Sequence, residues 1–155
     1  MFLSFNNKKN KVEKLNFDIT IDATKEKVWS LLWDDSTYPQ WTAPFCEGSY
    51  AESEWKEGSP IRFLSPGNNG MFGLIKKMEP NNFMSFEHLG EIRNGEEQKM
   101  DWGGALENYT LETLDNSTVL KVEVDITEAF KEYMSATFPQ ALIKLKQIAE
   151  DDRSI

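Results

Sequence analysis

The sequence predicts an α+β fold, with a curved antiparallel sheet of about seven strands and helices on one side of it. Several segments between residues 12 and 126 alternate apolar and polar side chains, which is typical of strands with one buried face. Residues 127–152 carry apolar side chains at steps of three and four, which indicates a long amphipathic helix. Because each surface has one apolar face, we expect the helix to lie across the sheet.

The predicted C-terminal helix covers Thr127 to Asp152. Its apolar face consists of Phe130, Met134, Phe138, Ala141, Leu142, Leu145, Ile148 and Ala149. Pro139 removes the helical hydrogen bond to the carbonyl group of Ser135, so we expect the helix to bend or split there. A bent helix over a curved sheet would leave space between the two.

The first strand is expected at Val12–Ile21, and two short helices follow it. The apolar period changes to a helical one over Ala23–Asp34. Tyr38–Trp41 predicts a second short helix or turn, since Pro39 suits the start of a helix. These two helices would form a V-shaped support for the sheet.

The remaining strands are separated by turns rich in glycine, proline and asparagine. They are expected at Gly48–Glu54, Ser59–Ser65, Met71–Met78, Phe83–Leu89, Glu107–Leu114 and Ser117–Ile126. Residues 90–106 are polar and glycine-rich, and we expect a loop there.

Two strand registers follow from these assignments. A tight turn at Asp115-Asn116 places Tyr109 opposite Val122 and Leu111 opposite Leu120. Across the longer loop at residues 90–106, the expected pairs are Phe86 with Tyr109, Met84 with Leu111, and His88 with Glu107.

Charge and cysteine content narrow the classes of partner. The chain has 17 basic and 26 acidic residues and a net charge of −9, which argues against nucleic acid or an anionic membrane as the main partner. Cys46 is the only cysteine, so an intrachain disulfide and a multi-cysteine zinc site are excluded. We therefore expect a cytoplasmic protein without a metal or other cofactor.

The N-terminal residues 1–11 are expected to form a flexible tail, followed by a single domain over residues 12–155. The opening apolar residues are too few for the core of a signal peptide and lack a preceding basic residue. No stretch approaches the roughly twenty apolar residues that a membrane span needs.

Several short segments, spread over residues 12–150, resemble a known superfamily. They are Ile21-Asp22-Ala23-Thr24 leading into Val28-Trp29, then Trp41, Gly73–Pro80, Thr118-Val119-Leu120, and Ala141-Leu142 to Leu145-Lys146. The chain resembles the SRPBCC superfamily, with its START-like or birch-pollen-allergen-like helix-grip fold. Within it, the chain looks most like the branch named after the activator of the heat-shock-protein-90 ATPase.

The resemblance implies a cavity between the last helix and the concave face of the sheet, and a small apolar or amphipathic ligand. It also implies a chaperone as an alternative partner for a protein-interaction module. The eukaryotic activator has a separate chaperone-binding N-terminal domain, for which 155 residues with a short tail leave no room. This partner is therefore weakly supported.

The inward faces of the predicted strands and helix indicate which side chains would line such a cavity. They are Phe86, His88, Trp102, Glu107, Tyr109, Leu111 and Val122 from the sheet and its loops, and Met134, Phe138 and Leu142 from the helix. A flexible methionine among aromatic rings suits a ligand of loosely defined shape. The alternative is that these side chains fill a close-packed core, and that Trp102 anchors its loop and does not cover the cavity.

His88 and Glu107 are the polar pair that could take part in catalysis. A carboxylate beside an imidazole is the minimum for a general base, so an enzyme of the polyketide cyclase or dehydratase kind is an alternative function. A structural ion pair is the competing interpretation. The sequence shows no cluster of metal ligands, no phosphate-binding loop and no nucleophile elbow.

Overall fold

The structure is a computed structural model that describes residues 12–152. The tail expected at residues 1–11 and the last residues of the expected domain, 153–155, lie outside the described residues.

Eight strands and three helices make up the described chain. In order, they are β1 (Val12–Ile21), α2 (Lys25–Trp33), α3 (Tyr38–Trp41), β2 (Tyr50–Ser53), β3 (Pro60–Ser65), β4 (Asn69–Glu79), β5 (Phe83–Arg93), β6 (Glu96–Lys99), β7 (Ala105–Leu114), β8 (Ser117–Thr127) and α4 (Glu128–Asp152). All the predicted elements are present, with ends shifted by a few residues.

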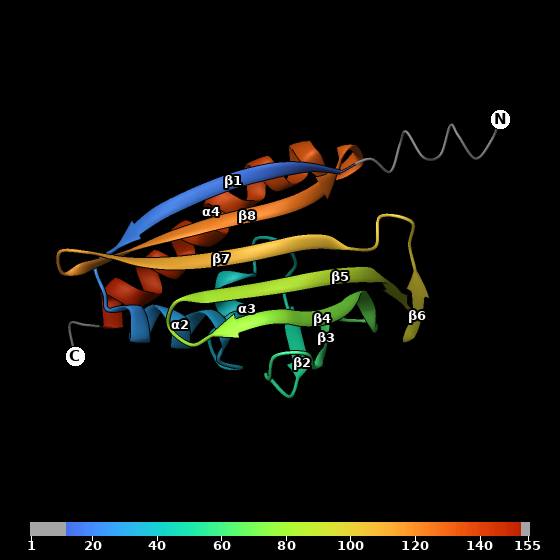
Figure 1. Cartoon of the computed structure of the whole chain (residues 1–155), viewed down its shortest axis with the longest axis horizontal. Coiled ribbons are helices and arrows are strands. Elements are labelled where there is room, and N and C mark those ends of the chain that lie inside the picture. The colour runs from blue at the N-terminus through green and yellow to red at the C-terminus, as the bar shows by residue number, and fades with distance from the viewer. Residues whose placement is uncertain (1–11, 153–155) are drawn as a thin grey trace.

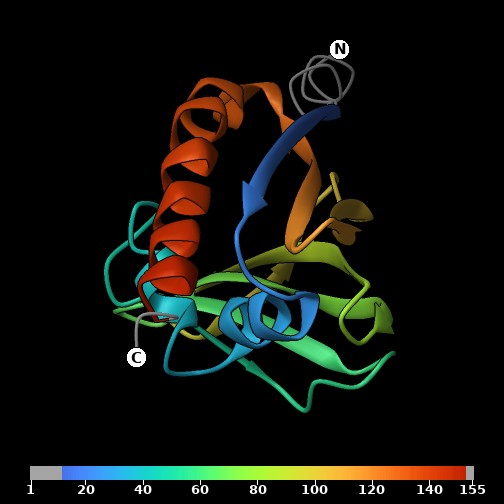
Figure 2. The same cartoon turned by 90° about the vertical axis from the view of Figure 1, so that its left-hand side faces the viewer.

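The strands form one antiparallel sheet in the order β1-β8-β7-β5-β4-β3-β2, with β6 paired to β5. Figure 1 shows the strands side by side with α4 behind β1 and β8. In the perpendicular view of Figure 2, the sheet curves so strongly that β1 and β8 stand beside α4 while the other strands pass below. The predicted α+β fold with a curved antiparallel sheet and a long C-terminal helix is confirmed.

The loop expected at residues 90–106 is wrong in its first half, because β5 continues to Arg93 and returns as β6. Asn94 and Gly95 form the connecting turn with φ angles of 52° and 83°. Positive φ at both central residues is the signature of a two-residue hairpin turn, for which Asn-Gly is the preferred sequence. The exposed, charged β6 is thus a strand in addition to the seven that were predicted.

The last helix runs without interruption through Pro139, so it does not split there. Figure 2 shows α4 as one coiled ribbon along its full length. Pro139 and Ser135 both lie on the exposed side of the helix. The Ser135 carbonyl group, which lacks its helical partner, can therefore be hydrated by solvent, and this limits the cost of the proline.

The core lies between α4, the short helices and the concave face of the sheet. From α4 it takes Phe138, Ala141, Leu142, Leu145 and Ala149, each at most 2% exposed. Around Trp33, the rings of Trp29, Trp41, Trp55, Phe86 and Tyr109 lie with centroids 4.9 to 6.5 Å from its own. The predicted apolar face of the helix is thus buried over its C-terminal half, whereas Phe130 near its start is 52% exposed.

Candidate functional site: a cavity beside the start of the last helix

A cavity of about 400 Å³ lies beside the part of α4 that does not pack tightly on the sheet. Its wall is made by α3 and the loop after it, by β3, β4, β5, β7 and β8, and by the first part of α4. Most lining side chains are apolar, and several are aromatic. They include Tyr38, Trp41, Phe45, Phe63, Met71, Trp102, Tyr109, Phe130, Tyr133, Met134 and Phe138.

A hydrogen-bonded cluster of His88, Glu107 and Tyr109 forms the polar part of this wall. His88 Nε2 lies 2.8 Å from Glu107 Oε1, and the Tyr109 hydroxyl group donates a hydrogen bond to Glu107 Oε2. The side chains of His88 and Glu107 are 8% and 21% exposed. Glu107 therefore has one neighbour on each carboxylate oxygen, in a site that is largely shielded from solvent.

The strand register that brings His88 to Glu107 differs from the predicted one by two residues. His88 is paired with Ala105, Met84 with Tyr109, and Phe86 with Glu107. The expected pairs of His88 with Glu107, Phe86 with Tyr109, and Met84 with Leu111 are therefore wrong as direct pairs. A shift of two keeps every side chain on the same face of the sheet, so His88 still reaches Glu107 along the diagonal.

The buried Tyr109 and the half-buried Tyr38 are both held in the neutral form. Burial first, and then the charge of Glu107, raise the pKa of Tyr109 well above its ordinary value. Burial and the same carboxylate also raise the pKa of Tyr38, which lines the cavity from α3. At neutral pH the two hydroxyl groups therefore keep their protons and can donate hydrogen bonds.

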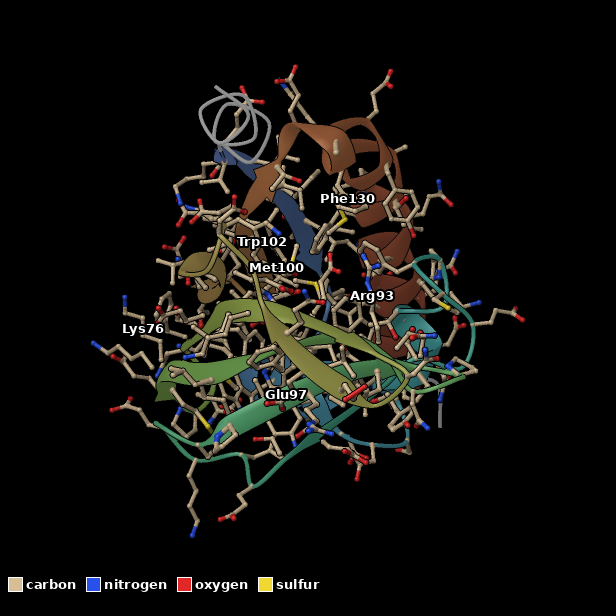
Figure 3. The ribbon with its side chains drawn as sticks, turned by 90° about the vertical axis from the view of Figure 1, so that its right-hand side faces the viewer. Lys76, Arg93, Glu97, Met100, Trp102 and Phe130 are labelled. Carbon is tan, nitrogen blue, oxygen red and sulfur yellow. The ribbon has the colours of Figure 1, made fainter. Side chains whose placement is uncertain are left out.

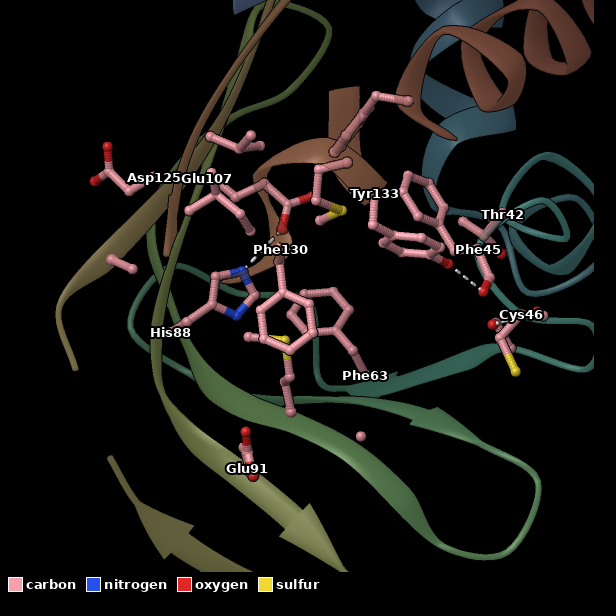
Figure 4. Close-up of a pocket in the computed structure, with 18 of the residues that line it drawn as sticks. Thr42, Phe45, Cys46, Phe63, His88, Glu91, Glu107, Asp125, Phe130 and Tyr133 are labelled. Atoms are coloured by element: carbon pink, nitrogen blue, oxygen red, sulfur yellow. Dashed lines mark hydrogen bonds and ion pairs between the residues drawn. The ribbon is translucent and has the colours of Figure 1, made fainter. Parts of the chain in front are cut away.

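The second ring nitrogen of His88, Nδ1, is buried and has no hydrogen-bond partner among the described residues. Figure 4 shows the ring projecting from β5, with one nitrogen joined to Glu107 and the other directed away from it. The neighbouring ring is Phe63, whose centroid lies 5.3 Å from that of His88. A buried nitrogen without a partner is rare in proteins, and here it belongs to a residue of the wall of an apolar cavity.

The ten predicted lining residues divide into two groups. Six of them line the cavity: His88, Trp102, Glu107, Tyr109, Met134 and Phe138. The other four, Phe86, Leu111, Val122 and Leu142, are at most 3% exposed and lie in the packed core outside the cavity wall. They point toward the helix as expected, but the sheet and α4 approach closely there and leave no space.

Several lining residues were not predicted because they come from the loop after α3, from β3 and β4, and from the exposed start of α4. Tyr133 is one example, since its hydroxyl group donates a hydrogen bond of 2.6 Å to the Phe45 carbonyl group and so joins α4 to the loop. The aromatic content of residues 38–45 was the available signal. Its connection to α4 depends on tertiary contacts that no local pattern encodes.

The turn that carries Trp102 is tied directly to His88. The Gly104 amide donates a hydrogen bond of 2.8 Å to the His88 carbonyl group, and the Gly103 amide donates one of 3.0 Å to Met100. Gly104 adopts a φ of 100°, which favours glycine. Figure 3 views the end of the molecule where Trp102, Met100 and Phe130 are found. Trp102 thus lines the cavity from a turn whose backbone is hydrogen-bonded to β5.

Two further properties hold for the described part of the chain. Residues 12–152 contain no group of three or more His, Cys, Asp or Glu side chains that could hold a metal ion. None of the helices in that range is long and apolar enough to cross a membrane.

Comparison with solved structures identifies the same fold in several proteins. The Aha1 dimer from Colwellia psychrerythraea aligns with a TM-score of 0.71 and 23% identity, over 89% of this chain and 96% of that one. CalU16 from Micromonospora echinospora aligns with a TM-score of 0.66 and 17% identity, over 92% of this chain and 80% of that one. DynU16, from the dynemicin biosynthetic locus, aligns with a TM-score of 0.67 and 14% identity, over 88% of this chain and 47% of that one.

Sequence comparison places the chain in a family. No curated protein sequence matches it. Residues 22–150, however, match the family described as "Activator of Hsp90 ATPase homolog 1-like protein". This match and the shared fold confirm the resemblance to the SRPBCC helix-grip superfamily. The chain therefore belongs to the AHSA1 family of activator of Hsp90 ATPase homolog 1-like proteins.

Proposed function

We propose that this protein binds one small apolar or amphipathic molecule in the cavity beside the start of α4. The observation that carries the proposal is the cavity itself, with about 400 Å³ of space and a mostly apolar wall that includes several aromatic side chains. Ligand sites commonly have volumes of roughly 300 to 1,000 Å³, few polar groups and a largely apolar lining. We place this activity in a single cytoplasmic domain, in keeping with the lone cysteine Cys46.

Titration with the neutral fluorescent probe N-phenyl-1-naphthylamine tests the proposal. Its fluorescence rises in apolar surroundings, so an increase in fluorescence reports binding. We expect about one probe to bind per chain at micromolar concentration. Met134→Trp replaces an unbranched side chain of the cavity wall by a large ring. The affinity for the probe should fall by about tenfold or more, because the probe and the ring compete for space.

Ile143→Trp is the matched control, because Ile143 lies on the same helix, is 51% exposed and does not line the cavity. This variant should bind the probe like the wild type. An unchanged affinity in Met134→Trp, or equal losses in both variants, would place the probe elsewhere and overturn the proposal.

A second candidate function is proton transfer, which the contact of 2.8 Å between His88 and Glu107 favours. A histidine oriented by a carboxylate can remove a proton from the carbon next to a ketone, as a cyclase or dehydratase requires. The test is exchange of the α-protons of 2-tetralone for deuterium, followed by NMR. A cyclase-like enzyme should accelerate the exchange, and His88→Ala should abolish the acceleration while the protein stays folded. No acceleration by the wild type would remove this candidate.

A chaperone partner is a third candidate, and family membership is what supports it. With a net charge of −9, a complex of this protein would be expected to depend on salt. Incubation with purified Hsp90 at low and high ionic strength tests it directly. Absence of a complex at low ionic strength would exclude this candidate.

A further inference from the structure

His88 Nδ1 is an unpaired polar atom in a residue of the cavity wall, and a ligand can reach it once the side chains that cover it move aside. The side chain is 8% exposed, and Nδ1 is one of two buried side-chain nitrogen or oxygen atoms without a partner in the described chain. The other is Trp33 Nε1, which lies among the aromatic rings of the core and does not line the cavity. Leaving such an atom unpaired costs about 1 to 3 kcal/mol, so a ligand that pairs it gains affinity.

The neighbours of His88 decide which kind of hydrogen bond Nδ1 can make. An ionised carboxylate only accepts hydrogen bonds, so the His88 nitrogen that faces Glu107 Oε1 must carry a proton. In the neutral ring, Nδ1 then keeps its lone pair and is an acceptor. The matching group on a ligand is a hydrogen-bond donor.

The charges around the cavity disfavour an anionic ligand. The lining residues include Glu91, Glu107 and Asp125 and no lysine or arginine. Glu91 is paired with Arg93 at 2.9 Å and Asp125 with Lys14 at 3.1 Å. Among the described residues, the hydrogen-bond partners of Glu107 are His88 and Tyr109 alone. A carboxylate on the ligand would meet the Glu107 charge inside an apolar wall, where charges are costly.

Building on the proposed function, we infer that the ligand is a neutral, largely aromatic or alicyclic molecule that donates an O–H hydrogen bond to His88 Nδ1. The group is a phenol, an enol or an alcohol. The cluster of His88, Glu107 and Tyr109 therefore selects hydroxylated apolar compounds and rejects apolar acids of the same shape.

Three probes of one shape test the inference by equilibrium dialysis at neutral pH: naphthalene, 2-naphthol and the anion of 2-naphthoic acid. Naphthalene measures the apolar cavity alone. One hydrogen bond to a buried acceptor should make 2-naphthol bind about threefold to tenfold more tightly than naphthalene. The anion should bind more weakly than either.

Variants show whether the preference comes from His88. His88→Phe keeps a ring but removes both nitrogens, and it should bind 2-naphthol no better than naphthalene. If this variant does not fold, Glu107→Gln decides the question. Its amide nitrogen can donate to His88 Nε2, which moves the ring proton to Nδ1. This variant should then favour 2-methoxynaphthalene, a hydrogen-bond acceptor, over naphthalene, whereas the wild type should not.

Glu112→Gln is the matched control. Glu112 lies on the same strand, is exposed and pairs with Lys121 outside the cavity. This variant should keep the preference for 2-naphthol. Equal binding of naphthalene and 2-naphthol by the wild type, tight binding of the anion, or a preference that persists in His88→Phe would each overturn the inference alone. If none of the three probes binds, the proposed function fails and the inference fails with it.

Discussion

His88 Nε2 contacts Glu107 Oε1 at 2.8 Å although the two residues are not partners in the sheet. The residue directly opposite His88 is Ala105, whose small side chain leaves room for the imidazole ring to lean toward Glu107. The Tyr109 hydroxyl group holds the other carboxylate oxygen. The orientation of the histidine is thus set by three strand residues around it, and this fixes which nitrogen is left without a partner.

The first prediction concerns the tautomer of His88. Since Nε2 faces a carboxylate, the proton of the neutral ring should reside on Nε2 in the wild type. In Glu107→Gln it should move to Nδ1. The chain contains one histidine, so long-range ¹H–¹⁵N correlation spectra report this residue without ambiguity. Glu107→Gln should also lower the free energy of unfolding by about 1 to 2 kcal/mol, because a charged hydrogen bond becomes a neutral one.

Glu112→Gln serves again as the control and should leave the histidine spectrum unchanged. A wild-type spectrum with the neutral ring protonated on Nδ1 would show that the contact with Glu107 does not determine the tautomer.

The second prediction is a loss of stability at high pH. The raised pKa values of Tyr38 and Tyr109 mean that the folded protein keeps protons that the unfolded chain releases from about pH 10 upward. Their contribution is complete below pH 10 and is lost as the pH rises above it. Each group lowers the free energy of unfolding by up to about 1.4 kcal/mol per pH unit in this range.

Urea denaturation of the wild type and Tyr109→Phe between pH 9 and pH 11 measures this effect. The variant should be less stable at neutral pH by about 1 to 2 kcal/mol, because Glu107 loses a donor. Its stability should then fall less steeply above pH 10. Ionisation of lysines is common to both proteins and cancels in the comparison. Parallel curves would show that Tyr109 does not resist ionisation.

The periodicity of the apolar residues and the residues typical of turns were sufficient to predict the fold. Alternation located the strands, and the Asp115-Asn116 turn fixed the register of β7 with β8, in which Tyr109 lies opposite Val122 as predicted. The register of β5 with β7 could not be obtained in this way, because the long connection between them contains an additional strand. The Asn94-Gly95 signal was present in the sequence but was assigned to a loop.

The cavity itself was harder to predict than its lining face. A sequence shows which side chains of a strand point inward, as it did for Phe86 and Tyr109. It does not show how closely the helix approaches them, and Phe86 is fully buried while His88, on the same face two residues on, lines the cavity. That difference depends on where α4 diverges from the sheet, which is a property of the whole fold.

The third prediction tests the backbone behind His88. Gly73 on β4 is paired with His88 at an irregularity in the strand, and a Cβ atom there would lie 2.0 Å from the Glu87 carbonyl oxygen. Gly73→Ala must push β4 and β5 apart. We expect a loss of about 1 to 3 kcal/mol in the free energy of unfolding. The histidine signals should also shift.

Gly103→Ala is the comparison, because the atom nearest to its added methyl group, outside the adjacent residues, would be the Met100 carbonyl oxygen at 3.1 Å. It should cost clearly less than Gly73→Ala. Equal stabilities of Gly73→Ala and the wild type would mean that the two strands can separate without loss.

The fourth prediction concerns Pro139 in the middle of α4. The residue is exposed and the helix continues through it, so alanine fits at this position and restores the hydrogen bond to the Ser135 carbonyl group. The difference in helix propensity is about 3 kcal/mol, and proline recovers part of it by restricting the unfolded chain. Pro139→Ala should therefore raise the free energy of unfolding by about 1 to 2 kcal/mol.

Lys144→Ala, at an exposed position of the same helix, is the control and should change the free energy of unfolding by less than about 0.5 kcal/mol. If Pro139→Ala destabilises the protein instead, the packing of Phe138 and Leu142 depends on the helix geometry that proline imposes, and binding of the naphthalene probes should weaken in the same variant.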